Sequence, residues 1–277
     1  MKNILLPTDF SENSKNAIKY SLKLFEGETV TFHILNSQKP SGYITSDVLY
    51  GTAGDSVYDG ILNDNKKELK KMIDYCKSQS ESENFTFVPK LDFDNIVDAV
   101  NQAVSLNNIE LIIMGTNGAT GAEEVVFGSN TLKLIRKANC PVLAIPEGYV
   151  YTKIDSFLLS VSYQYQLKND SLAVILDIVR KHNSTLKILE IEENSVEVDS
   201  SNGNYIDHFK DINMERFSIK NIPSAVAIDA FTQLIPVQFH AVFVERESFL
   251  DRFIFGSDTS KISYSTRVPL LIFRNYS

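Results

Sequence analysis

Residues 111–118 read LIIMGTNG, an apolar run that ends in two glycines, and after nine further residues Gly128-Ser129 opens another element. A nearly continuous apolar run is typical of a buried parallel strand. Glycine at the exit lets the backbone approach a ligand without a Cβ in the way. A helix that begins at Gly128-Ser129 offers free N–H groups and a partial positive charge, which suit a phosphate. Thr131 adds a hydroxyl, so the pattern predicts a phosphate-binding loop from Gly115 to Thr131.

The chain around this loop alternates apolar runs with helix-like stretches. Strands are expected at 3–6, 29–35, 85–90, 110–115 and 140–145, and helices at 12–26, 61–79, 94–107 and 128–138. This alternation is typical of βαβ units and predicts a parallel sheet covered on both faces. Ligands of such sheets bind beyond the carboxyl ends of the strands. The first strand leaves the sheet through Pro7-Thr8-Asp9, which places Asp9 to accept hydrogen bonds from a ribose or an adenine.

The sequence also repeats itself once. The turns VFGSNT at 126–131 and IFGSDT at 254–259 each precede a helix and then a strand, CPVLAI at 140–145 and VPLLIF at 268–273. Such a repeat indicates two similar halves, and Pro and Gly at 146–148 mark the boundary. We expect one domain at 1–147 and a second at 153–277. In the second half we expect strands at 155–161, 185–191, 214–219, 239–244 and 268–273, and helices at 170–182, 222–234 and 256–265.

Bulk properties narrow the class of protein. The 277 residues carry a net charge of -8, which argues against nucleic acid or an anionic membrane as the main partner. Cys76 and Cys140 lie far apart and are typical of reduced, buried thiols. No apolar run approaches the ~18 residues of a membrane span. We therefore expect a cytoplasmic protein.

Each part of the loop also has a purely structural explanation. Gly115 could permit a turn, Ser129 could cap its helix, and Asp9 could cap the first helix. The sequence lacks the Gly-x4-Gly-Lys-Ser/Thr motif and the Gly-x-Gly-x-x-Gly motif. Its four histidines do not cluster, and His33 and His240 are expected in the core. Three functions stay open: a nucleotide-binding regulatory module, a slow ATPase or phosphotransferase, and a structural pseudo-dimer or binder of an apolar ligand.

The spacing Gly-x2-Gly-x9-Gly-Ser, formed by Gly115, Gly118, Gly128 and Ser129, resembles the nucleotide-binding signature of the universal stress protein family. The stretches ILLPTDFS at 4–11 and CPVL at 140–143 are similar to the same family. The resemblance covers 1–147 strongly and 153–274 more weakly. It implies an α/β fold of two tandem, open five-stranded parallel sheets with strand order 3-2-1-4-5 and helices on both faces.

The resemblance also implies a site for an adenine nucleotide, which is ATP, ADP or AMP, with or without Mg²⁺. Asp9 and Gly115 would hold the ribose. The adenine pocket would be lined by Pro7, Thr8, Ile34 and Met114. The phosphates would lie against Asn117, Gly118, Gly128, Ser129, Asn130 and Thr131.

The second half departs from this pattern, and so does part of the first. In the loop of the first half, residues 119–127 contain no base and include Glu123 and Glu124. In the second half, Ser162 stands where Asp9 stands, the strand exit VFVERES at 242–248 has neither glycine, and only Gly256-Ser257 remains. Glu245 and Glu247 would repel a phosphate. We therefore expect nucleotide in the first half only, and the second half as its partner in an internal pseudo-dimer; a homodimer of the chain is also compatible with the sequence.

Overall fold

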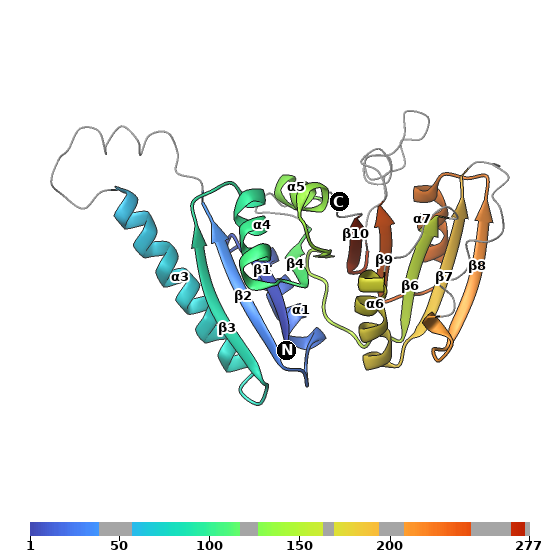
Figure 1. Cartoon of the computed structure of the whole chain (residues 1–277), viewed down its shortest axis with the longest axis horizontal. Helices are drawn as coiled ribbons and strands as arrows, with labels where there is room; N and C mark the ends of the chain where they lie inside the picture. Colours follow the sequence, from blue (N-terminus) through green and yellow to red (C-terminus); the bar gives the residue numbers. More distant parts are fainter. Residues whose placement is uncertain (39–56, 117–126, 163–168, 194–207, 245–266, 275–277) are drawn as a thin grey trace. The chain divides into compact units, whose positions relative to one another are not determined.

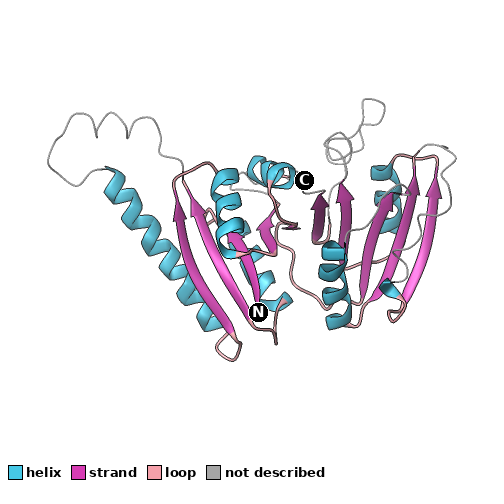
Figure 2. Ribbon diagram, in the orientation of Figure 1, coloured by secondary structure: helices cyan, strands magenta, loops and turns pink. Residues whose placement is uncertain are grey.

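Apolar runs of four to eight residues form the strands of the structure, a computed structural model that describes residues 1–38, 57–116, 127–162, 169–193, 208–244 and 267–274. The chain divides into two compact units, one that holds Met1–Gly121 and Gly128–Gly148 and one that holds Tyr149–Ser277. Strands and helices alternate throughout the first unit, and in the second unit two of the connections between strands are described helices (Figure 1; Figure 2). The predicted α/β class with tandem parallel strands is confirmed.

The first unit contains five strands in the order β3-β2-β1-β4-β5. All four neighbouring pairs are parallel. The strands are β1 (Lys2–Pro7), β2 (Val30–Ser37), β3 (Phe85–Asp92), β4 (Leu111–Gly115) and β5 (Val142–Ile145). The helices are α1 (Glu12–Leu24), α3 (Val57–Gln79), α4 (Ile96–Asn107) and α5 (Ser129–Lys137). Because β1 and β4 are adjacent, the strand order reverses between them, and ligands of open α/β sheets bind at that point.

The second unit repeats this order as β8-β7-β6-β9-β10, again with parallel pairs. Its strands are β6 (Ser156–Ser162), β7 (Thr185–Glu192), β8 (Met214–Lys220), β9 (Phe239–Val244) and β10 (Leu270–Arg274). Its described helices are α6 (Asn169–His182) and α7 (Ser224–Leu234). Numbered along the chain, the strands of each unit follow the order 3-2-1-4-5.

Buried apolar side chains hold each unit together. In the first unit, Phe32 of β2 is fully buried and packs edge-on against Phe85, at 5.1 Å between ring centroids. In the second unit, Phe157 of β6 stacks on Phe239 of β9 at 4.8 Å. Burial of one such ring contributes about 1.5–3 kcal/mol. Each unit therefore has its own buried apolar core.

Element boundaries differ from the predictions by a few residues. The helix expected at 61–79 begins at Val57, and the strand expected at 85–90 continues to Asp92. The longer strand follows from its pairing, because β3 keeps register with β2 as far as Ser37 and Asp92. The helix expected at 256–265 lies outside the described residues.

Candidate functional site

The ends of β1 and β4 form one edge of the first unit. The two strands pair with Ile4 opposite Leu111 and Leu5 opposite Ile112, and β1 then continues to Pro7 while β4 continues to Gly115. The predicted exits of both strands therefore lie side by side. The segment after β1 leads into α1, and the segment after β4 leads towards α5.

Asp9 forms the turn between β1 and α1. One oxygen of its carboxylate, Oδ1, accepts hydrogen bonds from the Ser11 amide at 3.0 Å and the Ser11 hydroxyl at 2.6 Å. Among the described residues its second oxygen, Oδ2, has no hydrogen bond, and the side chain is exposed. Between these residues, Phe10 has a φ of 62°, in the left-handed region that a bulky residue rarely adopts. Such strain costs of order 1–3 kcal/mol and occurs most often at functional sites.

The amide, the carbonyl and the hydroxyl of Thr8 all form hydrogen bonds. Its amide donates to the Leu35 carbonyl at 2.8 Å, and its own carbonyl accepts from Asn36 Nδ2 at 2.8 Å. Its hydroxyl accepts from the Phe10 amide at 3.0 Å and shares a hydrogen bond of 2.9 Å with the Ser14 hydroxyl. The turn that presents Asp9 is therefore rigid.

Gly115 is required by the packing of α1 on β4. A Cβ at this position would lie 2.8 Å from both Cγ and Oδ1 of Asn13, a largely buried residue of α1. An alanine or larger residue fits only if the Asn13 side chain or α1 itself shifts. The structural explanation of this glycine is thus close packing of a helix, and not the turn considered from the sequence alone.

Two hydrogen bonds hold the start of α5 against the end of β4. The Gly128 amide donates to the Thr116 carbonyl at 2.6 Å, and the Thr131 hydroxyl donates to the Gly115 carbonyl at 3.0 Å. The cap residue Gly128 has no side chain, so among the described residues no side-chain hydrogen bond caps this helix, and its first turn contains no acidic residue. In contrast, Ser11 and Asn95 cap α1 and α4 with their side chains. The first N–H groups of α5 thus form an uncapped, partially positive helix end beside Gly115.

The structure places most of the predicted site residues at this edge. Pro7 ends β1, Met114 and Gly115 end β4, Ser129 and Asn130 are exposed in the first turn of α5, and Thr131 is buried against Gly115. Ile34 is fully buried in β2, opposite Leu6. The predicted loop residues Asn117 and Gly118, and the acidic pair Glu123 and Glu124, lie outside the described residues.

Two features of this edge were not found from the sequence. Asn36, at the end of β2, is buried and ties β2 to Thr8 through the hydrogen bond described above. A hollow of about 610 Å³ lies between α4 and α5, and its polar lining includes Asp94, Asn95, Asp98, Asn130, Lys133 and Lys137. Lys133 and Lys137 follow Ser129 by one and two helical turns and line this hollow. The i,i+4 spacing of Ser129, Lys133 and Lys137 was the signal in the sequence that could have revealed these two lysines.

In the second unit, the corresponding edge is only partly described. The side chain of Ser162 and the stretch that contains Glu245, Glu247, Gly256 and Ser257 lie outside the described residues. Deeper in the unit, the hydroxyl of Ser160 and Nε2 of His240 share a buried hydrogen bond of 2.9 Å. Burial lowers the pKa of His240 to about 3, so the ring is neutral near pH 7. His240 therefore lies in the core, as its position in an apolar run predicted.

The side chains of both cysteines are buried. Cys76 and Cys140 are free, and burial raises the pKa of the Cys76 thiol to about 12 and that of Cys140 further still. Neither thiol is a reactive nucleophile. Within the described ranges no group of three or more His, Cys, Asp or Glu side chains could hold a metal ion, and no helix is long and apolar enough to cross a membrane.

Comparisons with known proteins agree with this geometry. The model of the universal stress protein family matches residues 1–146. A universal stress protein of Methanocaldococcus jannaschii is 28% identical over 157 residues, which cover 52% of this chain and 94% of that protein. A second one from the same organism is 26% identical over 154 residues, 52% of this chain and 81% of that protein. The crystal structure of a universal stress protein from Archaeoglobus fulgidus covers 98% of both chains, with a TM-score of 0.67 and 18% identity, and shows a shared fold.

Proposed function

Because the chain belongs to the universal stress protein family, we propose that its first unit binds one adenine nucleotide and acts as a regulatory module in a stress response. The nucleotide is ATP, ADP or AMP. The observation that carries this proposal is the uncapped N-terminus of α5, which lies beside the strand end at Gly115. Free N–H groups and the helix dipole favour an anion at such a place.

The residues present at this edge fit a nucleotide. Gly128, Ser129, Asn130 and Thr131 would hold the phosphates, with Asn117 and Gly118 in the preceding loop. Asp9 keeps one carboxylate oxygen without a hydrogen bond to the described residues, which suits a ribose hydroxyl. The adenine would lie against Pro7, Thr8, Ile34 and Met114. Lys133 would offset the negative charge of the phosphates, including those of ATP bound without Mg²⁺.

In this proposal the second unit binds no nucleotide. It lacks both glycines after β9, and it carries Glu245 and Glu247 directly after that strand. The two halves would associate as an internal pseudo-dimer in a cytoplasmic protein. The nucleotide state of the first unit would then be the signal that a protein partner reads.

We expect the purified protein to carry an adenine nucleotide, identified by mass spectrometry after denaturation. Incubation with ATP and Mg²⁺ should give turnover far below the ~10 s⁻¹ of a typical enzyme, because none of the residues assigned to the nucleotide is a histidine or a cysteine that could serve as base or nucleophile. Turnover near that value would contradict a regulatory module and favour an ATPase. Absence of any bound nucleotide, together with no thermal shift on adding ATP, ADP or AMP, would contradict the proposal itself.

Replacement Asp9→Asn is expected to weaken nucleotide binding about tenfold in calorimetric titrations. The loss follows from a charge-assisted hydrogen bond to the ribose, since bonds to charged groups contribute about 1.5–3 kcal/mol. The asparagine oxygen can still accept from Ser11, so the fold should be unchanged. Asp92→Asn is the matched control, because Asp92 ends β3 and accepts a similar turn bond of 2.8 Å from the Asp94 amide. Equal affinities for both variants and the unmodified chain would exclude Asp9 from the site.

A further inference from the structure

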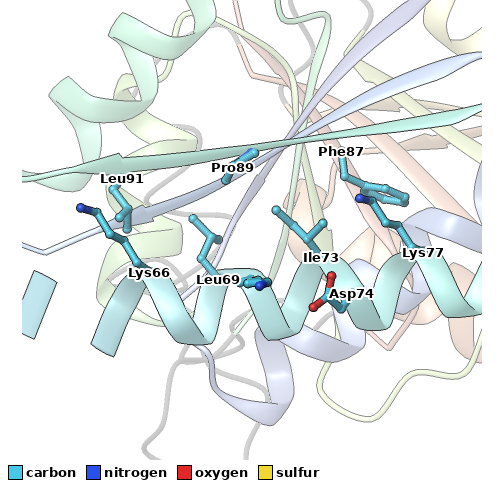
Figure 3. Close-up of a pocket in the computed structure, with 9 residues that line it drawn as sticks. Lys66, Leu69, Ile73, Asp74, Lys77, Phe87, Pro89 and Leu91 are labelled. Atoms are coloured by element: carbon cyan, nitrogen blue, oxygen red, sulfur yellow. The ribbon is translucent and has the colours of Figure 1, made fainter. Parts of the chain in front are cut away.

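A second concave site lies between helix α3 and the edge strand β3 of the first unit (Figure 3). Its volume is about 510 Å³, within the roughly 300–1,000 Å³ of small-molecule sites. The floor is apolar and is formed by Leu69, Ile73, Phe87, Pro89 and Leu91. None of the residues assigned to the nucleotide lines it.

The apolar floor follows from the periods of the two elements. Phe87, Pro89 and Leu91 alternate along β3 and therefore share the face of the strand that meets α3. Leu69 and Ile73 lie four residues apart and share one face of the helix. Phe87 and Leu91 are only half-buried and Pro89 is exposed, although all three face the groove. Apolar surface is therefore left open to a ligand along this strand.

Lysines on α3 differ in their partners according to the face they occupy. On one face, Lys67 pairs with Asp64 at 3.5 Å and Lys71 pairs with Glu68 at 2.7 Å. Lys66, which lines the groove, is exposed and makes no ion pair with any described residue. The groove therefore has a cationic rim, and Lys66 on it has no ion pair with the part of the helix that the structure describes.

The two ends of the groove differ in the charged residues that line them. Lys66 lies at the end of the groove beside Leu91, and Lys77 lies at the other end beside Phe87 (Figure 3). Lys70, four residues after Lys66, lines the groove and likewise has no ion pair among the described residues. Asp74, the acidic residue of the lining, precedes Lys77 by three positions. An anionic group is thus favoured at the Lys66 end of the groove, about two helical turns from Asp74.

We propose that this groove binds a free long-chain fatty acid. The acyl chain lies along the apolar floor between Leu91 and Phe87, and the carboxylate lies between Lys66 and Lys70. A nucleotide or other compact anion would leave the apolar floor uncovered, and a neutral lipid would leave the two lysines without an anion. The site is separate from the nucleotide site, and the proposal does not depend on it.

A series of octanoate, decanoate and dodecanoate, titrated as monomers into the intact chain by calorimetry, tests the apolar part. Affinity should rise roughly threefold to fourfold for each methylene that enters the groove. Dodecyltrimethylammonium, with the same tail and a cationic head, should bind much more weakly than dodecanoate. Absence of dodecanoate binding, affinity independent of chain length, or equal binding of the cationic amphiphile would each overturn the proposal.

A pair of double variants tests the position of the carboxylate. Lys66→Gln/Lys70→Gln should weaken dodecanoate binding about tenfold, as expected for the loss of two exposed charge contacts. Lys67→Gln/Lys71→Gln removes the same charge one position along the same helix and should leave the affinity within twofold. Equal weakening in both would show a non-specific effect of net charge and would overturn the assignment. ATP affinity should be unchanged in both variants, so failure of this proposal is distinguishable from failure of the nucleotide site.

Discussion

Gly115→Ala is expected to weaken nucleotide binding at least tenfold and to lower the free energy of unfolding by about 1–3 kcal/mol. The new methyl group would lie 2.8 Å from Cγ and Oδ1 of Asn13. Asn13 is a short, largely buried side chain, so it has little room to move. The strain would separate α1 from β4 and displace the carbonyl that accepts the hydrogen bond of Thr131. Urea denaturation and calorimetric titration with ATP measure the two effects.

A second substitution controls for this explanation. Asn13→Ala removes the atoms that the new Cβ would meet, so the double variant Asn13→Ala/Gly115→Ala should recover much of the stability lost in Gly115→Ala. Recovery of nucleotide affinity should accompany it, because the end of β4 returns to its place. If Gly115→Ala has the stability and affinity of the unmodified chain, then the close packing described for this glycine is wrong.

Acidification from pH 7.5 to pH 5.0 is expected to destabilise the second unit by about 2 kcal/mol through His240 alone. The pKa of His240 is about 3 in the folded chain and near 6.5 when unfolded. Between these values the unfolded chain binds one more proton, so stability falls by about 1.4 kcal/mol for each unit of decreasing pH. The stability is fully present above pH ~6.5 and is lost progressively as the pH falls towards the folded pKa. Circular dichroism during urea denaturation at both pH values measures the change.

The control for this pH effect replaces the buried pair with apolar side chains. Ser160→Ala/His240→Leu removes the titrating ring and its hydroxyl partner together, so no polar group of the pair is left without a hydrogen bond. The fall in stability between pH 7.5 and 5.0 should be smaller by about 2 kcal/mol in this variant. His33, whose pKa is lowered by burial and by Lys90, titrates in both proteins and cancels from the comparison. An identical fall in both would show that His240 is not the group responsible.

The sequence was sufficient for the fold because its signals were local. Alternating apolar runs, such as LIIMG at 111–115, define elements without reference to the rest of the chain. The strand order followed from family resemblance, and the structure confirms it in both units. Element ends were less accurate because pairing with a neighbouring strand decides them, as for Asp92 opposite Ser37.

The candidate site was predictable as a set of residue types at strand ends, but not as a set of contacts. Nothing in the pattern around Gly115 reveals that Asn13, about a hundred residues earlier, lies against it. The left-handed Phe10 is likewise invisible, because its side chain type argues against that conformation. The groove beside Lys66 depends on how α3 lies along β3, and such a contact between two distant elements has no periodic signal.

The central claim is that one unit of this chain binds an adenine nucleotide and the other does not. Native mass spectrometry of the chain with a saturating excess of ATP, ADP or AMP counts the bound molecules directly. One nucleotide per chain is expected for at least one of the three, and at a nucleotide concentration near the Kd of the unmodified chain the occupancy of Gly115→Ala should be several-fold lower. Two nucleotides per chain would contradict the assignment to the first unit alone, and none with any of the three would contradict the claim altogether.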